Sequence, residues 1–296
     1  MNENPKKKRF LPRAAALHDL SGFGRCALTV VIPTLSAMGT QCVPVPTALL
    51  STHTGGFTGM YFRDLEEIGA VSGIGAHYGE LGLDFDAVYT GFLGSAGQVA
   101  AVEAFIDTVS AGGGNRPLVF IDPVMGDDGV LYSACVPELA DAMRRLIARA
   151  DVITPNLTEA FLLAGEPYRD TTDLTPEAAA ATVGRLVGKI SAYTNAAVIV
   201  TGIPSGDRIG TCAGGRFCYE RRRARAYPGT GDIFASVVLG RLLRDGRRDA
   251  EAIYDAAAFA SSFTAYTIDF SVEHGADEPS RDGVLLEGCL DRLIRK

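Results

Sequence analysis

A carboxylate directly behind two glycines is the part of this sequence best suited to chemistry. Gly229 and Gly231 flank Thr230, and Asp232 follows at the mouth of an apolar, helix-forming run. Glycines let the backbone turn tightly with its N–H groups facing one way, and a helix N-terminus adds partial positive charge there. Such a turn would hold the charge of a migrating phosphoryl group, while Asp232 accepts the proton of the attacking hydroxyl. The alternative is a glycine turn in which Asp232 only caps the helix.

Oxygen-bearing side chains follow two of the apolar runs. Asp122 comes at the end of one run, and Asn156 and Glu159 fall in the first turn of a helix after the next. Hard oxygen ligands of this kind suit Mg²⁺, which takes one or two carboxylates together with phosphate oxygens. Each has a structural alternative: Asp122 begins a capped loop, and Asn156 with Glu159 caps a helix. Residues 127–129 predict a surface turn.

Two glycine-rich segments could form the other wall of a small-molecule site. Residues 19–25 lack the G-x-G-x-x-G spacing of a dinucleotide site, so we expect Asp19 and Ser21 to make polar contacts on a pocket floor. Residues 51–59 have the composition of a flap over a substrate. In that flap His53 either contacts the substrate or is an ordinary polar-loop histidine. The arginines within 221–225 predict a solvated edge, with one of them a candidate for the nucleotide phosphates.

Short apolar runs alternate with helical patterns, which predicts a mostly parallel sheet covered by helices on both faces. Buried strands are predicted at residues 14–18, 43–46, 87–89, 118–121, 152–153 and 198–200. Helices are predicted at residues 25–38, 96–110, 137–149, 158–164, 176–192, 233–243, 250–268 and 283–294. The runs 208–212 and 216–220 flank two glycines and predict a β-hairpin. We therefore expect a doubly wound, three-layer αβα sandwich with an antiparallel edge, and ligands at the carboxyl ends of its strands.

Size and composition restrict the class of protein. The chain has 296 residues, of which 47% are hydrophobic, and predicts one α/β domain over residues 14–296 behind a basic tail at residues 1–13. A net charge of −7 without acidic blocks favours a small-molecule partner over nucleic acid. Six scattered cysteines indicate reduced thiols in a cytoplasmic protein. No apolar stretch reaches membrane-spanning length, so no membrane partner is expected.

Taken together, six motifs resemble the pyridoxal/pyridoxamine kinases of the ribokinase-like superfamily, from about His18 to the C-terminal helices. The number and order of the motifs carry the resemblance. They are His18-Asp19-Leu20-Ser21-Gly22-Phe23-Gly24, residues 51–56, Tyr89-Thr90-Gly91-Phe92-Leu93-Gly94-Ser95, Asp122-Pro123-Val124-Met125-Gly126, Pro155-Asn156-Leu157-Thr158-Glu159 and Gly229-Thr230-Gly231-Asp232.

The resemblance implies ATP-dependent phosphorylation of the 5′-hydroxymethyl group of pyridoxal, pyridoxine or pyridoxamine. It makes Asp232 the base, and Gly229, Thr230 and Gly231 the anion hole. The positions that would face ATP or its Mg²⁺ are Asp122, Thr154, Asn156, Glu159 and Thr201, with Asp122 and Glu159 nearest the metal. The positions that would surround the pyridine ring are Asp19, Ser21, Thr47, His53, Thr54 and Tyr89. Family members are usually homodimers, and a monovalent cation such as K⁺ often assists.

Rival functions stay open at this point. Many members of the resembling family carry Ser where Asp19 stands, and a carboxylate there could contact the ring nitrogen or the 3-hydroxyl. A hydroxymethylpyrimidine kinase shares the fold, but many such enzymes carry Cys at the position of Asp232. A sugar kinase lacks support, because the expected N-terminal Gly-Gly pair is not evident. A non-catalytic pyridoxal-phosphate carrier or sensor is the rival from another class.

Overall fold

The computed structural model describes residues 9–111, 116–133, 135–223, 225–275 and 280–294. Nine strands form one sheet in the order β11-β10-β9-β8-β5-β4-β1-β2-β3. Their bounds are β1 Arg13–Phe23, β2 Gln41–Thr52, β3 Phe62–Asp64, β4 Ala87–Thr90, β5 Leu118–Ile121, β8 Val152–Ile153, β9 Ala197–Ser205, β10 Arg208–Ala213 and β11 Arg216–Arg221. The six strands from β9 to β2 are parallel, whereas β3 pairs antiparallel with β2, β10 with β9, and β11 with β10. A separate small hairpin joins β6 (Gly126–Asp127) to β7 (Val130–Leu131).

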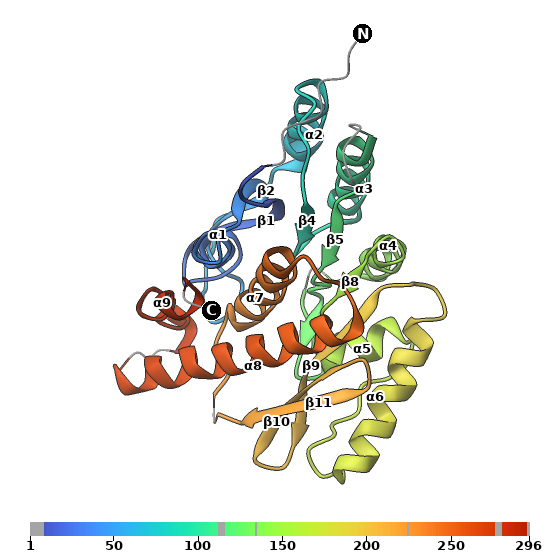
Figure 1. Cartoon of the computed structure of the whole chain (residues 1–296), viewed down its shortest axis with the longest axis vertical. Helices are drawn as coiled ribbons and strands as arrows, with labels where there is room; N and C mark the ends of the chain where they lie inside the picture. Colours follow the sequence, from blue (N-terminus) through green and yellow to red (C-terminus); the bar gives the residue numbers. More distant parts are fainter. Residues whose placement is uncertain (1–8, 112–115, 134, 224, 276–279, 295–296) are drawn as a thin grey trace.

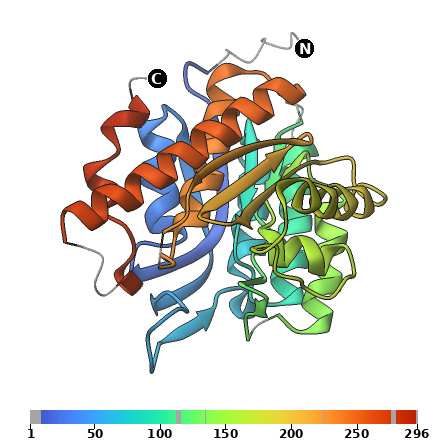
Figure 2. The same ribbon diagram turned by 90° about the horizontal axis from the view of Figure 1, so that it is seen from below.

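Helices cover both faces of this sheet, as Figure 1 shows and Figure 2 confirms from below. One face carries α1 (Leu28–Ala37), α7 (Thr230–Asp245), α8 (Ala250–Glu273) and α9 (Asp291–Ile294). The other carries α2 (Ala70–Glu80), α3 (Ala96–Ala111), α4 (Pro137–Ile147), α5 (Leu157–Leu163) and α6 (Pro176–Ile190). Alternation along β1 divides the core: Ala14 and Ala16 pack with the first group, and Ala15 and Leu17 with the second.

The predicted three-layer αβα sandwich with a mostly parallel sheet is confirmed. The hairpin of β10 and β11 forms the expected antiparallel edge. Residues 127–129 form the predicted turn, in which Asp128 and Gly129 have φ of 47° and 77°.

Three features differ from the prediction. A second antiparallel edge, β3, follows the expected flap at residues 51–59 and pairs with β2. The helix α2 escaped prediction because Gly73, Gly75 and Gly79 dilute its helical pattern. The helix predicted at 283–294 is wrong: the chain makes a 3₁₀ turn at Leu286–Gly288 and only the short α9. Glycines at 283 and 288 explain the break, since Gly283 has a φ of 80°.

The N-terminal segment expected as a tail is described from Arg9 onward. Arg9 forms ion pairs with Asp84 and Asp86, at 2.5 and 2.6 Å. The backbone N–H of Arg13 also donates to Asp86 (2.8 Å), which leads the chain into β1. In the part of the chain that the structure describes, no helix combines the length and the apolar character needed to cross a membrane.

Candidate active site

A cleft of about 450 Å³ opens at the carboxyl ends of the parallel strands. Thirteen of the fifteen side chains and turn residues predicted from the sequence line it. They are Asp19, Ser21, His53, Thr54, Asp122, Thr154, Asn156, Glu159, Thr201, Gly229, Thr230, Gly231 and Asp232. The expectation that strand ends and the helix after the glycine turn share one edge of the sheet is therefore met by the geometry of the cleft.

Asp232 lies where the N-termini of two helices converge. It belongs to the first turn of α7, and its Oδ2 accepts a hydrogen bond (2.9 Å) from the backbone N–H of Ala27, the residue that precedes α1. Burial raises the pKa of Asp232 to about 7, the hydrogen bond from Ala27 opposes that rise, and the charge of Asp19 adds to it. A carboxyl that titrates near neutral pH is suited to accept a proton from an alcohol.

The two glycines before Asp232 have different structural roles. Gly229 has a φ of 79°, and a Cβ at this position would lie 2.1 Å from the carbonyl oxygen of Arg25. Gly231 faces open space, because a Cβ there would meet no atom of the described residues within 4 Å beyond its own turn of helix. The fold therefore requires a glycine at 229, whereas the free space beside Gly231 belongs to the cleft. Thr230 fixes the turn by donating from its Oγ1 to the carbonyl of Tyr227 (2.8 Å).

Asp122 enters the cleft from the end of β5, on the side facing Asp232. Its Oδ1 accepts a hydrogen bond from Thr154 Oγ1 (2.9 Å). Burial, and then the neighbouring charge of Asp232, raise the pKa of Asp122, while the Thr154 bond lowers it. A cation between these acids would relieve the cost of ionising them.

Asn156 and Glu159 form a complete capping box at the start of α5. Asn156 Oδ1 accepts from the N–H of Glu159 (2.9 Å), and Glu159 Oε2 accepts from the N–H of Asn156 (2.8 Å). The other oxygen of Glu159 accepts from the N–H of Met125 (3.0 Å). Both oxygens of Glu159 are therefore engaged with the backbone, so its capping role, one of the two weighed from the sequence, is present. Burial and the charge of Asp122 hold the pKa of Glu159 well above its usual range.

A metal ion would need oxygen ligands from outside the protein. Among the described residues, no group of three or more His, Cys, Asp or Glu side chains is arranged to hold one. Asp122 retains its Oδ2, which receives no hydrogen bond from those residues. The donor set thus fits Mg²⁺ that arrives with phosphate oxygens and keeps several waters.

The opposite wall comes from β1 and from the loop after β2. Asp19 is buried and accepts a hydrogen bond from Ser21 Oγ (2.7 Å), and burial raises its pKa. His53 bridges the loop internally, because its Nδ1 accepts from the N–H of Gly55 (3.0 Å). That bond assigns the proton to Nε2, which donates to the carbonyl oxygen of Arg281 (2.6 Å).

Two predicted residues do not line the cleft. Thr47 and Tyr89 are both fully buried within their strands. β2 continues to Thr52, so Thr47 lies inside the strand rather than at its end. Tyr89 packs its ring edge-on against His18 and Phe120, with ring centres 4.3 and 5.3 Å apart.

The arginines ahead of the glycine turn also lie away from the cleft lining. Arg223 pairs with Asp269 of α8, and Arg222 Nη1 donates to Thr172 Oγ1 (3.3 Å). Sequence reasoning missed several residues that do line the cleft: Cys26, Ala27, Phe92, Tyr132 and Arg281. Phe92 follows a strand end already singled out, so its position was a usable signal. Arg281 had none, because its place depends on how the chain returns after α8.

Comparisons with known proteins agree with this geometry. A family model described as phosphomethylpyrimidine kinase matches residues 31–278. The pyridoxal kinase PdxY of Deinococcus radiodurans is 30% identical over 250 residues, which cover 80% of this chain and 81% of that protein. The chain spans about half the length of other curated relatives, such as PdxY of Pseudomonas entomophila, at 31% identity over 152 residues.

Solved structures extend the likeness over nearly the whole chain. A Bacteroides thetaiotaomicron protein, described as a candidate phosphomethylpyrimidine kinase, is 38% identical, has a TM-score of 0.85, and covers 98% of this chain and 96% of its own. A second crystal form of that protein contains pyridoxal. Pyridoxal kinase from Lactobacillus plantarum is 30% identical with a TM-score of 0.82, over 96% of this chain and 97% of its own.

Fold, cleft and relatives together define a phosphotransferase of the ribokinase-like fold. The chain belongs to the phosphomethylpyrimidine kinase family, and it is similar in sequence to the pyridoxal kinases named above.

Proposed function

We propose that this protein transfers the terminal phosphoryl group of ATP to the 5′-hydroxymethyl group of pyridoxal, pyridoxine or pyridoxamine. The observation that carries the proposal is Asp232, a base of near-neutral pKa that stands beside the open space at Gly231 and at two helix N-termini. The pyridoxal kinase relatives and the pyridoxal-containing structure support this class of alcohol.

In the proposed reaction, Asp232 accepts the hydroxyl proton as the alcohol oxygen attacks the terminal phosphorus. The bond from that phosphorus to ADP breaks as the new one forms, so ADP leaves with the electron pair. The N–H groups of the first turn of α7 stabilise the charge on the transferred group, because they have no partner within the helix. Asp19, Ser21 and Thr54 line the side of the cleft where the ring would lie.

On the nucleotide side, Asp122, Thr154, Asn156 and Thr201 line the cleft from the ends of β5, β8 and β9. We propose that Asp122 holds Mg²⁺ directly through its Oδ2, and that Glu159 acts through water because its oxygens bind the backbone. Mg²⁺, when bound, supplies positive charge to the phosphate oxygens. A requirement for K⁺ is proposed on the family likeness alone.

We also propose a homodimer, as the family resemblance implies. The edge strand β3 offers a surface for it, since Tyr61 and Phe62 expose 60% and 45% of their area beside Leu49 of β2, at 41%. Open edges with large apolar side chains tend to pair with another chain. Sedimentation equilibrium should give twice the mass of the 31.2 kDa chain, and a single-chain mass at micromolar concentration would refute this.

The decisive experiment follows product by mass spectrometry. The protein is incubated with ATP and Mg²⁺ and, in separate reactions, with each B6 vitamer and with hydroxymethylpyrimidine. We expect a phosphate ester of a B6 vitamer together with ADP. Phosphorylation of the pyrimidine alone would instead support the family's other name. Tight binding of a vitamer without any ester would support a carrier or sensor.

A further inference from the structure

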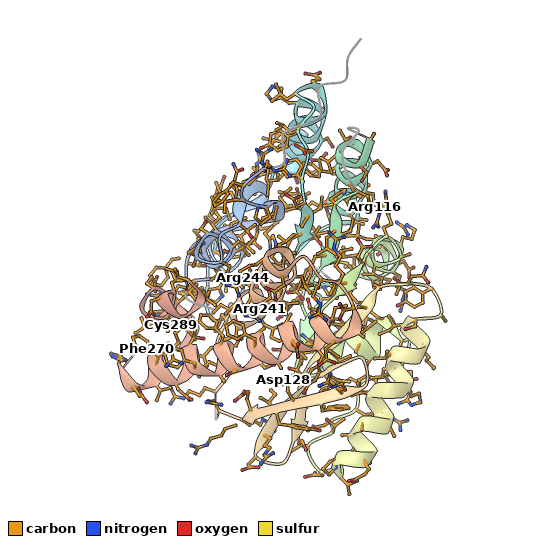
Figure 3. The ribbon with its side chains drawn as sticks, viewed as in Figure 1. Arg116, Asp128, Arg241, Arg244, Phe270 and Cys289 are labelled. Atoms are coloured by element: carbon orange, nitrogen blue, oxygen red, sulfur yellow. The ribbon has the colours of Figure 1, made fainter. Side chains whose placement is uncertain are left out.

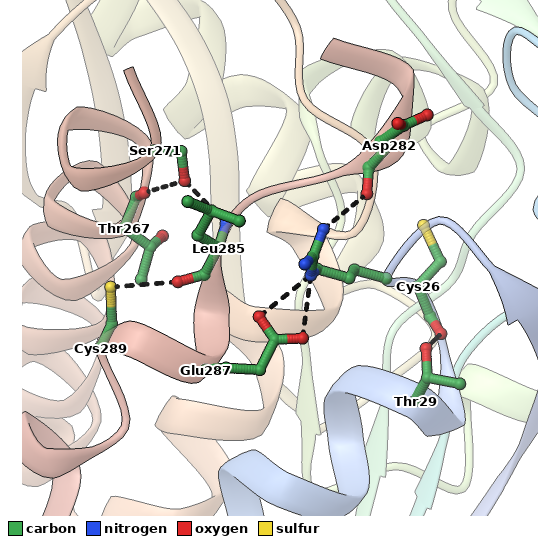
Figure 4. A network of polar contacts seen from close by, with 9 residues as sticks. Cys26, Thr29, Thr267, Ser271, Asp282, Leu285, Glu287 and Cys289 are labelled. Carbon is green, nitrogen blue, oxygen red and sulfur yellow. Dashed lines mark hydrogen bonds and ion pairs between the residues drawn. The ribbon is translucent and has the colours of Figure 1, made fainter. Parts of the chain in front are cut away.

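The chain returns to the active site after α8, far from the cleft in sequence. We name residues 281–289 the C-terminal strap. Gly288 packs on Phe270 so closely that a Cβ would lie 2.5 Å from the ring, and Figure 3 shows Phe270 and Cys289 together at this end of α8. Ser271 Oγ accepts from the N–H of Leu285 (2.7 Å), as Figure 4 shows. The strap therefore packs on α8 through both a close backbone contact and a hydrogen bond.

Arg25 ties the loop between β1 and α1 to this strap. Its Nε donates to both carboxylate oxygens of Glu287, at 2.9 and 3.0 Å, and its Nη1 donates to the carbonyl oxygen of Asp282 at 3.3 Å (Figure 4). Backbone packing reinforces the contact, since a Cβ on Gly283 would meet the carbonyl oxygen of Gly24 at 2.8 Å. One side chain thus joins residues 262 positions apart.

The loop so held is strained. Arg25 and Ala27 have φ of 47° and 51°, in the left-handed region that is strained for a residue other than glycine. Such conformations persist only where the surroundings hold them. Cys26 between them contributes through its carbonyl oxygen, which accepts from Thr29 Oγ1 at 2.7 Å (Figure 4). Arg25 itself is held through its side chain by the strap.

The strained loop carries the hydrogen-bond donor of the catalytic base. The N–H of Ala27 donates to Asp232, and the carbonyl oxygen of Arg25 lies against Gly229, leaving no room for a Cβ there. A shift of this loop would therefore move both the donor to the carboxylate and one wall of the glycine turn.

We propose that Arg25 is a positioning residue for the transfer reaction, and that Glu287 and the carbonyl of Asp282 act through it to hold Ala27 N–H against Asp232. The inference rests on the proposed function in that it takes Asp232 as the general base. Neither Arg25 nor Glu287 needs to touch substrate for this role.

The role predicts a definite direction of pH change. Several ionisable groups interact with Asp232. The charge of Asp19 in β1 raises the pKa of Asp232. The charge of Asp232 in turn raises the pKa values of Cys26 in the strained loop, Tyr89 of β4, Asp122 after β5 and Tyr132 after β7. These stay in place when Glu287 is changed. Loss of the Ala27 donor removes the hydrogen bond that favours the charged carboxylate, so the pKa of Asp232 should rise and activity should need a higher pH.

The test compares Glu287→Gln with Glu251→Gln. Both glutamates are exposed, at 68% and 58% of the side chain, and both pair with an arginine, but Glu251 pairs with Arg216 away from the cleft. We expect Glu287→Gln to lower kcat about 2- to 5-fold, the size of a lost exposed ion pair, and Glu251→Gln to leave it unchanged. Arg25→Ala should lower kcat further, with Arg25→Lys between the two, because lysine keeps the charge without the planar fork.

Two readouts separate positioning from simple destabilisation. The kcat/KM profile should shift to higher pH in Glu287→Gln at an unchanged melting temperature. Hydrogen–deuterium exchange of a peptide covering residues 24–28 should speed up in Glu287→Gln and not in Glu251→Gln.

Identical exchange and identical pH profiles in the two glutamine variants would overturn the inference. The exchange measurement needs no turnover, so it also separates this inference from the proposed function. If Asp232→Asn kept its turnover, the assignment of the base would fail alone, and exchange at residues 24–28 would still decide whether Arg25 holds the loop.

Discussion

Replacing Asp232 with asparagine should stabilise the folded protein at pH 8 while it removes most of the turnover. The carboxyl has a pKa of about 7 in the folded protein and an ordinary value of 3.8 in the unfolded chain. Because the folded value is raised, the fold is favoured below pH 4, and stability is lost as the pH rises from about 4 to about 7. Asparagine carries no charge and can still accept from Ala27 N–H.

The magnitude follows from the same two pKa values. Ionising the carboxyl inside the folded protein at pH 8 costs up to about 4 kcal/mol, and water in the open cleft reduces this to roughly 1–3 kcal/mol. Asp232→Asn should therefore unfold at higher urea concentration than the parent protein at pH 8, and at a similar concentration at pH 4. Turnover with pyridoxal and ATP should fall by about 10²- to 10⁴-fold, the usual contribution of a general base.

The assay is urea unfolding at the two pH values, paired with initial rates. A variant no more stable than the parent at pH 8 would show that ionised Asp232 does not destabilise the folded protein. Near-normal turnover would remove Asp232 from proton transfer. Opposite effects on stability and rate are the signature of a group held for chemistry rather than for folding.

Four further substitutions test the site. Gly229→Ala should lower unfolding free energy by roughly 1–3 kcal/mol, because of its φ of 79° and the carbonyl of Arg25. Gly231→Ala should raise KM for ATP at an unchanged melting temperature; equal melting temperatures of the two alanine variants would refute this distinction. Asp122→Asn should raise the Mg²⁺ concentration for half-maximal rate about tenfold, and an unchanged Mg²⁺ titration would exclude Asp122 as a ligand. Asp19→Ala should change KM unequally among the three vitamers, and three unchanged KM values would show that Asp19 does not contact the ring.

Much of the fold could be predicted because its signals are local. The runs that form β5 and β8 were predicted residue for residue, since each is a fully buried apolar run followed directly by a polar residue. The Gly-Gly pair before Arg216 likewise predicted the hairpin of β10 and β11. Helix α2 and the edge strand β3 carried no such signal, because glycines weaken the first and packing against β2 creates the second.

The residues of the candidate site can likewise be separated into those with a local sequence signal and those without one. Residues at strand ends, such as Asp122 and Thr154, could be placed from the sequence, since parallel strands bring their carboxyl ends to one edge. Thr47 illustrates the limit: a strand end cannot be located when the strand runs six residues further than its apolar core. Arg281 was out of reach, because it enters the cleft only through the tertiary return of the C-terminal strap.

The hydrogen bond that holds the carboxylate of Asp232 comes from the main chain of Ala27. Every amino acid except proline supplies that amide, so the side chain at position 27 can change while the hydrogen bond to the carboxylate is kept. A mutational survey of this position should accordingly tolerate small residues, glycine best of all given its φ of 51°, and reject proline. Selection should act instead on Arg25 and Glu287, the side chains that hold this loop although they lie far apart in the sequence.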